Sequence, residues 1–106
     1  MDKFDFDYSE YSDILHIHKT GNLTSGSVGI GDFSLDFDNK ENIIGVEIEH
    51  ASEFFNNLDI DKESLNKIKS AEIIVDSRNP SCHLVFLKLK FPMGIKKISV
   101  PMPVVS

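Results

Sequence analysis

The chain has 106 residues, of which 41% are apolar, and its 17 acids and 11 bases give a formal net charge of −6. These values fit one small folded domain, 1–106, and exclude a disordered or fibrous chain. Charges interrupt every apolar run and the first residues are acidic, so we expect no membrane partner and no secretory signal. The single cysteine, Cys82, excludes an intrachain disulfide framework and favours a cytoplasmic location.

The charge is unevenly distributed along the chain. Residues 1–59 carry 13 acids and three bases, a net charge of −10, whereas residues 60–106 carry four acids and eight bases, a net charge of +4. We favour the interpretation that strands of the two halves pair and offset each other. The alternative is two oppositely charged faces that guide self-association or a partner. The overall acid excess argues against a nucleic-acid partner.

Strand patterns dominate the first half of the chain. Residues 13–19 alternate, with Leu15 and Ile17 on one face, and residues 33–37 and 43–50 alternate in the same way. The polar residues 38–42 between the last two segments predict a hairpin turn. Because one face of these strands is apolar, the sheet needs a cover.

Helix signals follow the third strand. Ser52 is placed to cap a short helix that contains Phe54 and Phe55, and Asp61 is placed to cap a second helix that runs to about Ser70. We expect these helices to cover the apolar face of the sheet.

The strand pattern returns in residues 72–76, 82–91 and 95–100. The sequence therefore predicts an α+β fold, in which a mostly antiparallel sheet of about six strands is covered on one face by one or two short helices. Residues 56–106 supply a helix and the C-terminal strands. Pro101 and Pro103 place the following tail at an edge or outside the sheet.

A known pattern covers about the first 55 residues. It is carried by these segments: Phe6-Asp7, Asp13-Ile14-Leu15-His16-Ile17, Leu35-Asp36-Phe37-Asp38, Ile44-Gly45-Val46-Glu47-Ile48 and Ala51-Ser52. The pattern resembles a family of small prokaryotic domains of unknown function, whose members read Tyr-Asp, Asp-x-Leu-Tyr-Ile, Val-Gly-Ile-Glu-Ile and Ala-Ser. His16 stands where the family has an aromatic residue. Some such domains look like partners of small toxin-like proteins, so the resemblance implies a binding role by analogy.

Two histidines form the candidate metal site. His16 and His18 lie two residues apart on one strand, so their rings share a face at a spacing that suits zinc, copper or nickel. A third ligand would come from Glu47, Glu49 or His50. The alternative interpretation is two histidines on an exposed sheet face, and this is the one we favour.

The acidic turn that contains Asp36, Asp38 and Glu41 offers hard oxygen ligands for a divalent cation. It lacks the glycine and the spaced glutamate of an EF-hand loop. We therefore favour a hairpin turn in which Asp and Asn side chains bond their own backbone.

The sequence contains no nucleophile elbow, phosphate-binding loop or dinucleotide fingerprint, and we assign no catalytic and no cofactor-binding residue. Lys88, Lys90 and Lys96 are expected to gather on one side of the last hairpin near Phe86. Such a strip serves either nucleic acid or, as we favour, protection of an edge strand.

We therefore expect a non-enzymatic interaction module that self-associates, as in a homodimer, or binds a small protein partner. The apolar tail 100–105 is the expected contact surface. The alternative function is a divalent-cation-binding protein that uses His16, His18 and the acidic hairpin residues.

Overall fold

The computed structural model describes residues 3–79 and 82–102. These residues form two antiparallel sheets and two short helices, with strand order β1-β2-β5-β4-β3 in the five-stranded sheet and β6-β7-β8 in the three-stranded sheet. The elements are β1 Phe4–Ser9, β2 Ile14–Lys19, β3 Gly26–Ile30, β4 Phe33–Phe37, β5 Ile43–Glu49, α1 Ala51–Asn56, α2 Lys62–Leu65, β6 Ser70–Asn79, β7 Cys82–Phe91 and β8 Gly94–Val100.

The α+β class and the antiparallel pairing are confirmed, but the expected count of about six strands is wrong. The described part of the chain has eight, and the two additional strands are β1 and β3. β3 has the sequence Gly-Ser-Val-Gly-Ile, and its two glycines are more typical of a loop than of a strand. β1 alternates Phe4, Phe6 and Tyr8 with acids, and its pairing with β2 along its whole length makes it a strand.

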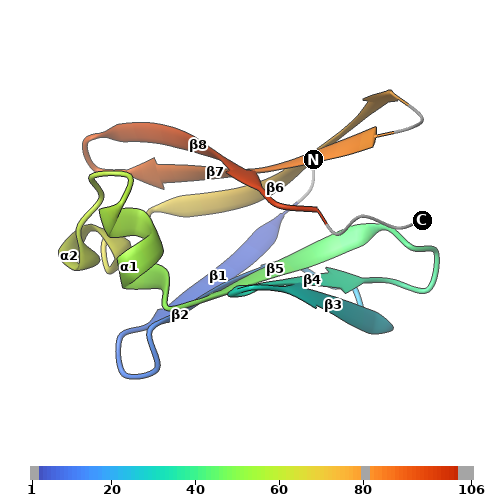
Figure 1. Cartoon of the computed structure of the whole chain (residues 1–106), viewed down its shortest axis with the longest axis horizontal. Helices are drawn as coiled ribbons and strands as arrows, with labels where there is room; N and C mark the ends of the chain where they lie inside the picture. The colour runs from blue at the N-terminus through green and yellow to red at the C-terminus, as the bar shows by residue number, and fades with distance from the viewer. Residues whose placement is uncertain (1–2, 80–81, 103–106) are drawn as a thin grey trace.

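The two sheets stack face to face (Figure 1), and β6 lies over β1, β2 and β5. The shared core contains Leu15 and Val46 from the first sheet, Val85 and Leu87 from the second, and Phe55 from α1. The expectation that helices cover the first sheet is therefore wrong, because a second sheet covers it. The helices instead close one end of the stack (Figure 1).

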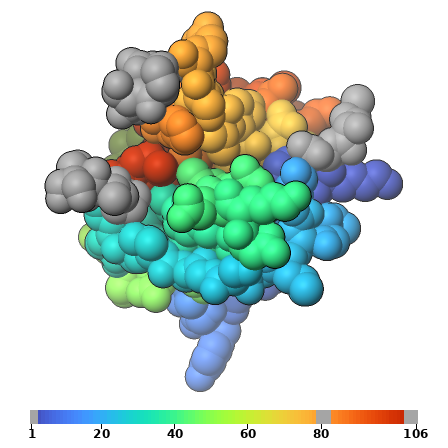
Figure 2. Space-filling view, turned by 90° about the vertical axis from the view of Figure 1, so that its right-hand side faces the viewer, coloured from blue at the N-terminus to red at the C-terminus, as the bar shows by residue number. Residues whose placement is uncertain are grey.

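Each sheet is built from one half of the chain, and this overturns the favoured interpretation of the charge asymmetry. In the described residues no strand of one half pairs with a strand of the other half. Residues 4–49 carry ten acids and two bases, whereas residues 70–100 carry two acids and five bases. Figure 2 shows residues 70–79 and 82–100 as one layer above the layer formed by the first half. The sequence asymmetry is therefore an asymmetry of the two outer faces.

The helices begin differently from what the sequence predicted. The prediction that Ser52 caps α1 is wrong, since the N-cap is His50, which has a left-handed backbone and makes no side-chain cap. Asp61 caps α2 as predicted, and its Oδ1 accepts a hydrogen bond of 2.8 Å from the backbone N–H of Ser64. α2 ends at Leu65 and does not reach Ser70, because Ser70 pairs with Lys90 as the first residue of β6.

Asp13 fixes the start of α1 from outside the helix. Its Oδ1 accepts hydrogen bonds from the Tyr8 hydroxyl at 2.6 Å and from the backbone N–H of Ser52 at 2.9 Å, and its Oδ2 accepts from the Ser52 hydroxyl at 2.7 Å. The backbone N–H of Ala51 donates to the Asp13 carbonyl. We call Tyr8, Asp13 and Ser52 the Asp13 clamp. It replaces the missing N-cap of α1 and ties that helix to the β1–β2 turn.

The clamp changes the acidity of its members. Burial raises the pKa of Asp13, but the hydrogen bonds from Ser52 and Tyr8 outweigh burial and hold this pKa below its ordinary value. Burial and the neighbouring carboxylate raise the pKa of Tyr8. Because the pKa of Asp13 is lower in the folded state, its stabilising contribution is complete above the unfolded-state pKa. It is lost as the pH falls through the folded-state pKa.

We expect Asp13→Asn to lower the free energy of unfolding at pH 7 by about 1 to 3 kcal/mol, because it removes a charged acceptor of three hydrogen bonds. Asn tolerates the left-handed backbone of this position, where φ is 57°. Urea unfolding between pH 3 and pH 7 measures the effect, and the gap between variant and wild type should narrow as the pH falls. Asp5→Asn on the exposed face of β1 is the control. Equal loss in both variants would contradict the assignment.

Candidate functional site

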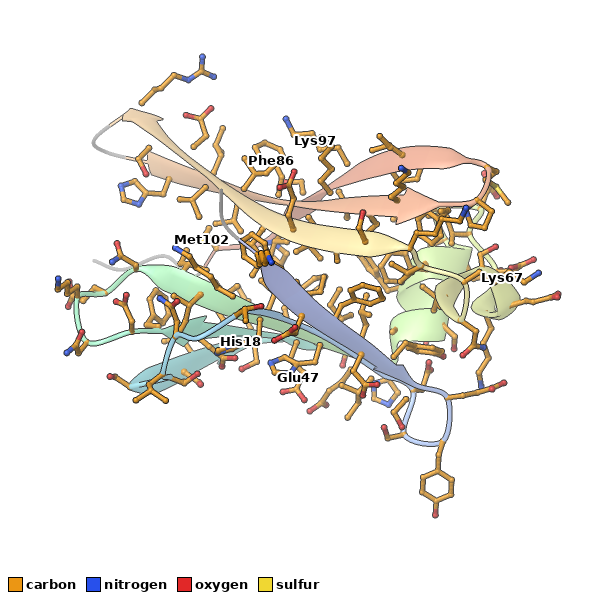
Figure 3. All side chains as sticks on the ribbon, turned by 180° about the vertical axis from the view of Figure 1, so that it is seen from behind. His18, Glu47, Lys67, Phe86, Lys97 and Met102 are labelled. Atoms are coloured by element: carbon orange, nitrogen blue, oxygen red, sulfur yellow. The ribbon has the colours of Figure 1, made fainter. Side chains whose placement is uncertain are left out.

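The outer face of the five-stranded sheet carries the predicted histidines. The His16 and His18 rings share this face, with their centroids 5.8 Å apart. His16 Nε2 lies 3.4 Å from Asp36 Oδ2, and His18 Nε2 lies 3.2 Å from Thr24 Oγ1. Glu47 is directly opposite His16 in the β2–β5 register, and Figure 3 shows Glu47 and His18 on the same side of the sheet. The structure therefore brings two imidazoles and two carboxylates to one face.

The other two candidate ligands lie in a different group. His50, Glu49 and Asp32 place one ligand atom each within 4.8 Å of one another, and all three residues are exposed. His50 Nδ1 lies 3.2 Å from Asp32 Oδ1, and this hydrogen bond, with the charge of Asp32, raises the pKa of His50. Sequence reasoning did not name Asp32, because only the pairing of β4 with β5 brings it to the end of β5.

The Asp36 and Asp38 carboxylates of the acidic turn make hydrogen bonds within the protein. Asp38 accepts hydrogen bonds from the backbone N–H groups of Lys40 and Asn42 and from the Asn42 side chain. These bonds lower the pKa of Asp38, with the backbone N–H of Asn42 as the largest cause. Asp36 lies on the sheet face instead, where its Oδ1 accepts from the Ser27 hydroxyl at 2.7 Å. The turn therefore has the structural role that we favoured.

Gly45 makes room for the Asp36 side chain. A Cβ at position 45 would lie 2.5 Å from Asp36 Oδ2 and 3.0 Å from Asp36 Cβ, which is closer than van der Waals contact allows. Asp36 on β4 therefore lies across the bare backbone of Gly45 on β5 and reaches His16 on β2, the strand on the other side of β5. This explains the glycine in the middle of a central strand, where an ordinary side chain is otherwise preferred.

We expect Gly45→Ala to lower the free energy of unfolding by about 1 to 3 kcal/mol, because the added methyl overpacks this site. The matched control is Gly29→Ala on β3, where a new Cβ would meet only the Phe33 carbonyl oxygen at 3.8 Å. Urea unfolding of both variants at pH 7 measures the difference. A Gly45→Ala variant as stable as Gly29→Ala would show that Asp36 moves aside without cost.

The outer face of the three-stranded sheet differs in character. Every second residue of β7, such as Val85 and Leu87, is buried against the other sheet. The residues between them, and their cross-strand partners on β6 and β8, point outward. We call this surface the lysine face; it consists of Glu72, Ile74, Asp76, Leu84, Phe86, Lys88, Lys90, Ile95, Lys97 and Ser99. Figure 3 shows Phe86 and Lys97 on the opposite side of the molecule from His18 and Glu47.

The lysines of this face are differently partnered. Lys88 Nζ lies 3.7 Å from Glu72 Oε1, whereas Lys97 Nζ lies 4.4 Å from the centre of the Phe86 ring. Asp76 is paired with Arg78 at 2.7 Å. No ion pair of Lys90 or Lys97 occurs within residues 3–79 and 82–102. Lys90 and Lys97 therefore have no ion pair in this part of the chain, although Lys97 contacts the Phe86 ring and, after the hydrogen bonds of Arg78, its charge helps to lower the pKa of Asp76.

The predicted lysine strip is corrected by one residue. Phe91 pairs with Gly94, so Lys88 lies opposite Lys97, and Lys96 lies opposite the buried Leu89 on the other face. The difference arises because the loop between the strands contains only Pro92 and Met93. The strip is therefore Lys88, Lys90 and Lys97.

The apolar tail lies on the chain's own core as far as the structure describes it. Val100 is buried and Met102 packs partly buried against the core. Residues 103–105 of the predicted contact surface lie outside the described residues. Val100 and Met102 are therefore engaged with the core, whereas the side chains of Leu84 and Ile95 on the lysine face are 48% and 57% exposed.

Together, the fold is a stack of two antiparallel sheets with an acidic and a basic outer face. No family model matches the chain, and no solved structure matches it. It is similar to an uncharacterised protein of the archaeon Methanocaldococcus jannaschii, with 35% identity over 65 residues. The match covers 61% of this chain and 52% of the relative, so the chain matches about half of that protein. The expected resemblance to uncharacterised prokaryotic proteins is confirmed, and it brings no activity with it.

None of the helices in residues 3–79 and 82–102 has both the length and the apolar character that a bilayer crossing requires.

Proposed function

We propose that the protein is a non-enzymatic interaction module that binds a small acidic protein partner through the lysine face. The observation that carries this proposal is the mixture of exposed apolar side chains and unpaired lysines on one sheet surface. Leu84 and Ile95 are about half exposed; Leu84 lies two residues from Phe86 on β7, and Ile95 is opposite Lys90 toward the other end of that strand. Apolar and aromatic side chains next to cations are typical of protein interfaces.

The cross-strand register gives a further reason for an acidic partner. Lys88 and Lys97 are directly opposite each other, and like charges at opposed positions destabilise a sheet. Their ammonium groups turn away from each other, one toward Glu72 and the other over Phe86. A carboxylate of a partner between them would relieve this repulsion and gain hydrogen bonds.

Self-association is the second form of this proposal. The outer face of the five-stranded sheet carries Asp5, Asp7, Asp36, Glu47 and Glu49, so a second copy offers an acidic surface to the lysine face. This contact joins two different surfaces. It is therefore heterologous, and because the two surfaces lie on opposite sides of the molecule, it would join copies into a ring or an open chain and not into a closed dimer.

We expect the double variant Leu84→Glu and Lys97→Glu to abolish partner capture, because it places two acids where the partner's acids would lie. The measurement is quantitative mass spectrometry of proteins retained from a lysate of the source cells, together with native mass spectrometry of the purified protein. The retained amount of a specific partner, or of the complex with a second copy, should fall at least about tenfold, which corresponds to loss of about 1.4 kcal/mol of binding energy.

The matched control is Leu23→Glu with Lys40→Glu, which makes the same change of charge on loops away from the lysine face. Leu23 is 86% exposed and Lys40 lies in the β4–β5 turn, so neither change affects the core. The control should retain the partner. Equal retention by both double variants, or equal loss, would contradict a role of the lysine face.

A divalent-cation function is the second candidate, and it rests on His16, His18 and Asp36, which share one sheet face although their ligand atoms do not all lie within 4.8 Å of one another. Two imidazoles and a carboxylate are ligands that zinc accepts, and Glu47 stands opposite His16. Zinc binds the neutral form of an imidazole, so protons compete with the metal for such ligands.

We expect zinc, added in equimolar amount to protein purified without chelator, to give one bound ion per chain in native mass spectrometry at pH 7.5. His16→Ala with His18→Ala should remove the bound mass, whereas the control His50→Ala should keep it. Retention of zinc by the double variant would exclude this site. Loss in His50→Ala alone would assign the ion to Asp32, Glu49 and His50.

A further inference from the structure

A groove of about 520 Å³ lies between the start of β1 and the outer side of β6 and β7. Its polar lining contains the lysines Lys3, Lys69, Lys88 and Lys90. The two sheets meet here, and Figure 1 shows the start of β1 close to β6. We call it the β1–β6 groove. Its volume lies in the range of small-molecule binding sites.

The groove is basic although the chain is acidic. Four lysines and two acids, Asp5 and Glu72, line it, so its local charge is +2. Lys88 is paired with Glu72. No carboxylate lies at ion-pair distance from Lys3, Lys69 or Lys90 within the described ranges. Three unpaired cations from three different segments therefore line one concave surface.

Backbone hydrogen bonds hold these segments in place. The N–H of Thr20 donates to the Lys3 carbonyl at 2.9 Å, and the N–H of Lys69 donates to the Lys90 carbonyl at 2.8 Å. The hydroxyl residues Thr20 and Ser70 line the groove beside these lysines. Ammonium and hydroxyl donors on fixed strand ends suit an oxyanion with several acceptor oxygens, as phosphate has.

The remaining wall is apolar. Phe4, Phe6, Ala71 and Ile95 line it, and the Phe6 and Ile95 side chains are 36% and 57% exposed. A ligand that carried only charge would leave the apolar wall exposed to water, whereas a ligand with an apolar or aromatic part would cover it. The lining thus has one part for an anion and one part for a ring or hydrocarbon.

We infer that the β1–β6 groove binds a small phosphate monoester that carries an apolar or aromatic group. Lys3, Lys69 and Lys90 hold the phosphate, and Phe4, Phe6 and Ile95 contact the rest of the molecule. This is a small-molecule site in addition to the protein-binding role proposed for the lysine face. Glu72, Lys88, Lys90 and Ile95 belong to both surfaces, so a bound ligand would alter part of the lysine face.

The test is an NMR titration of ¹⁵N-labelled protein with adenosine monophosphate at constant ionic strength, because salt screens exposed charges. Adenosine and inorganic phosphate, titrated separately, report the two parts of the ligand. We expect adenosine monophosphate to shift amide signals of Lys3 to Phe6, Thr20 and Lys69 to Glu72, and to bind more tightly than either part. Shifts elsewhere, or none, would overturn the proposal, as would phosphate alone binding as tightly.

The variants are Lys3→Gln with Lys69→Gln, and the matched control is Lys40→Gln with Lys67→Gln. Both pairs change the net charge equally, and Lys67 is paired with Glu63 on α2 outside the groove. We expect the first pair to weaken binding at least about tenfold and the control to leave it unchanged. Equal weakening by both pairs would show general attraction and overturn the site. Leu84, Phe86 and Lys97 are untouched, so this result is separate from that for partner binding.

Discussion

The carboxylate of Asp13 ties the connection between the two sheets to the first sheet. The only covalent path between the sheets runs from β5 through α1 and α2 to β6, and α1 begins without a side-chain cap of its own. Asp13 reaches this start from the β1–β2 turn and accepts hydrogen bonds from the backbone and hydroxyl of Ser52. By fixing the direction of α1, the clamp helps place Phe55 in the core and β6 over the first sheet.

The clamp also gives a physical meaning to part of the family-like pattern. Asp13, Ala51 and Ser52 belong to that pattern, and the structure joins them through hydrogen bonds of one turn and one helix start. Gly45 is a second such position, because it makes room for Asp36. These pattern residues therefore serve the fold, and their presence in a relative would indicate a shared architecture before it indicated a shared activity.

The stacking of the sheets turns a charge difference along the chain into a difference between two surfaces. The acidic half forms one outer face and the basic half forms the other, with an apolar core between them. The lysine face and the β1–β6 groove adjoin on the basic side and share Glu72, Lys88, Lys90 and Ile95. An anionic ligand in the groove would reduce the charge that attracts an acidic partner, so the two proposed functions would be linked.

The sequence by itself determined the strands with clear alternation, the cap at Asp61, and the shared face of His16 and His18, because these depend on neighbours in the chain. It did not reveal β3, because this glycine-containing segment forms a strand through its backbone pairing with β4. The second sheet as the cover, the opposition of Lys88 and Lys97, and the gathering of Asp32 with His50 depend on packing and strand register. Only the tertiary structure decides these, since contacts between distant segments have no local sequence signal.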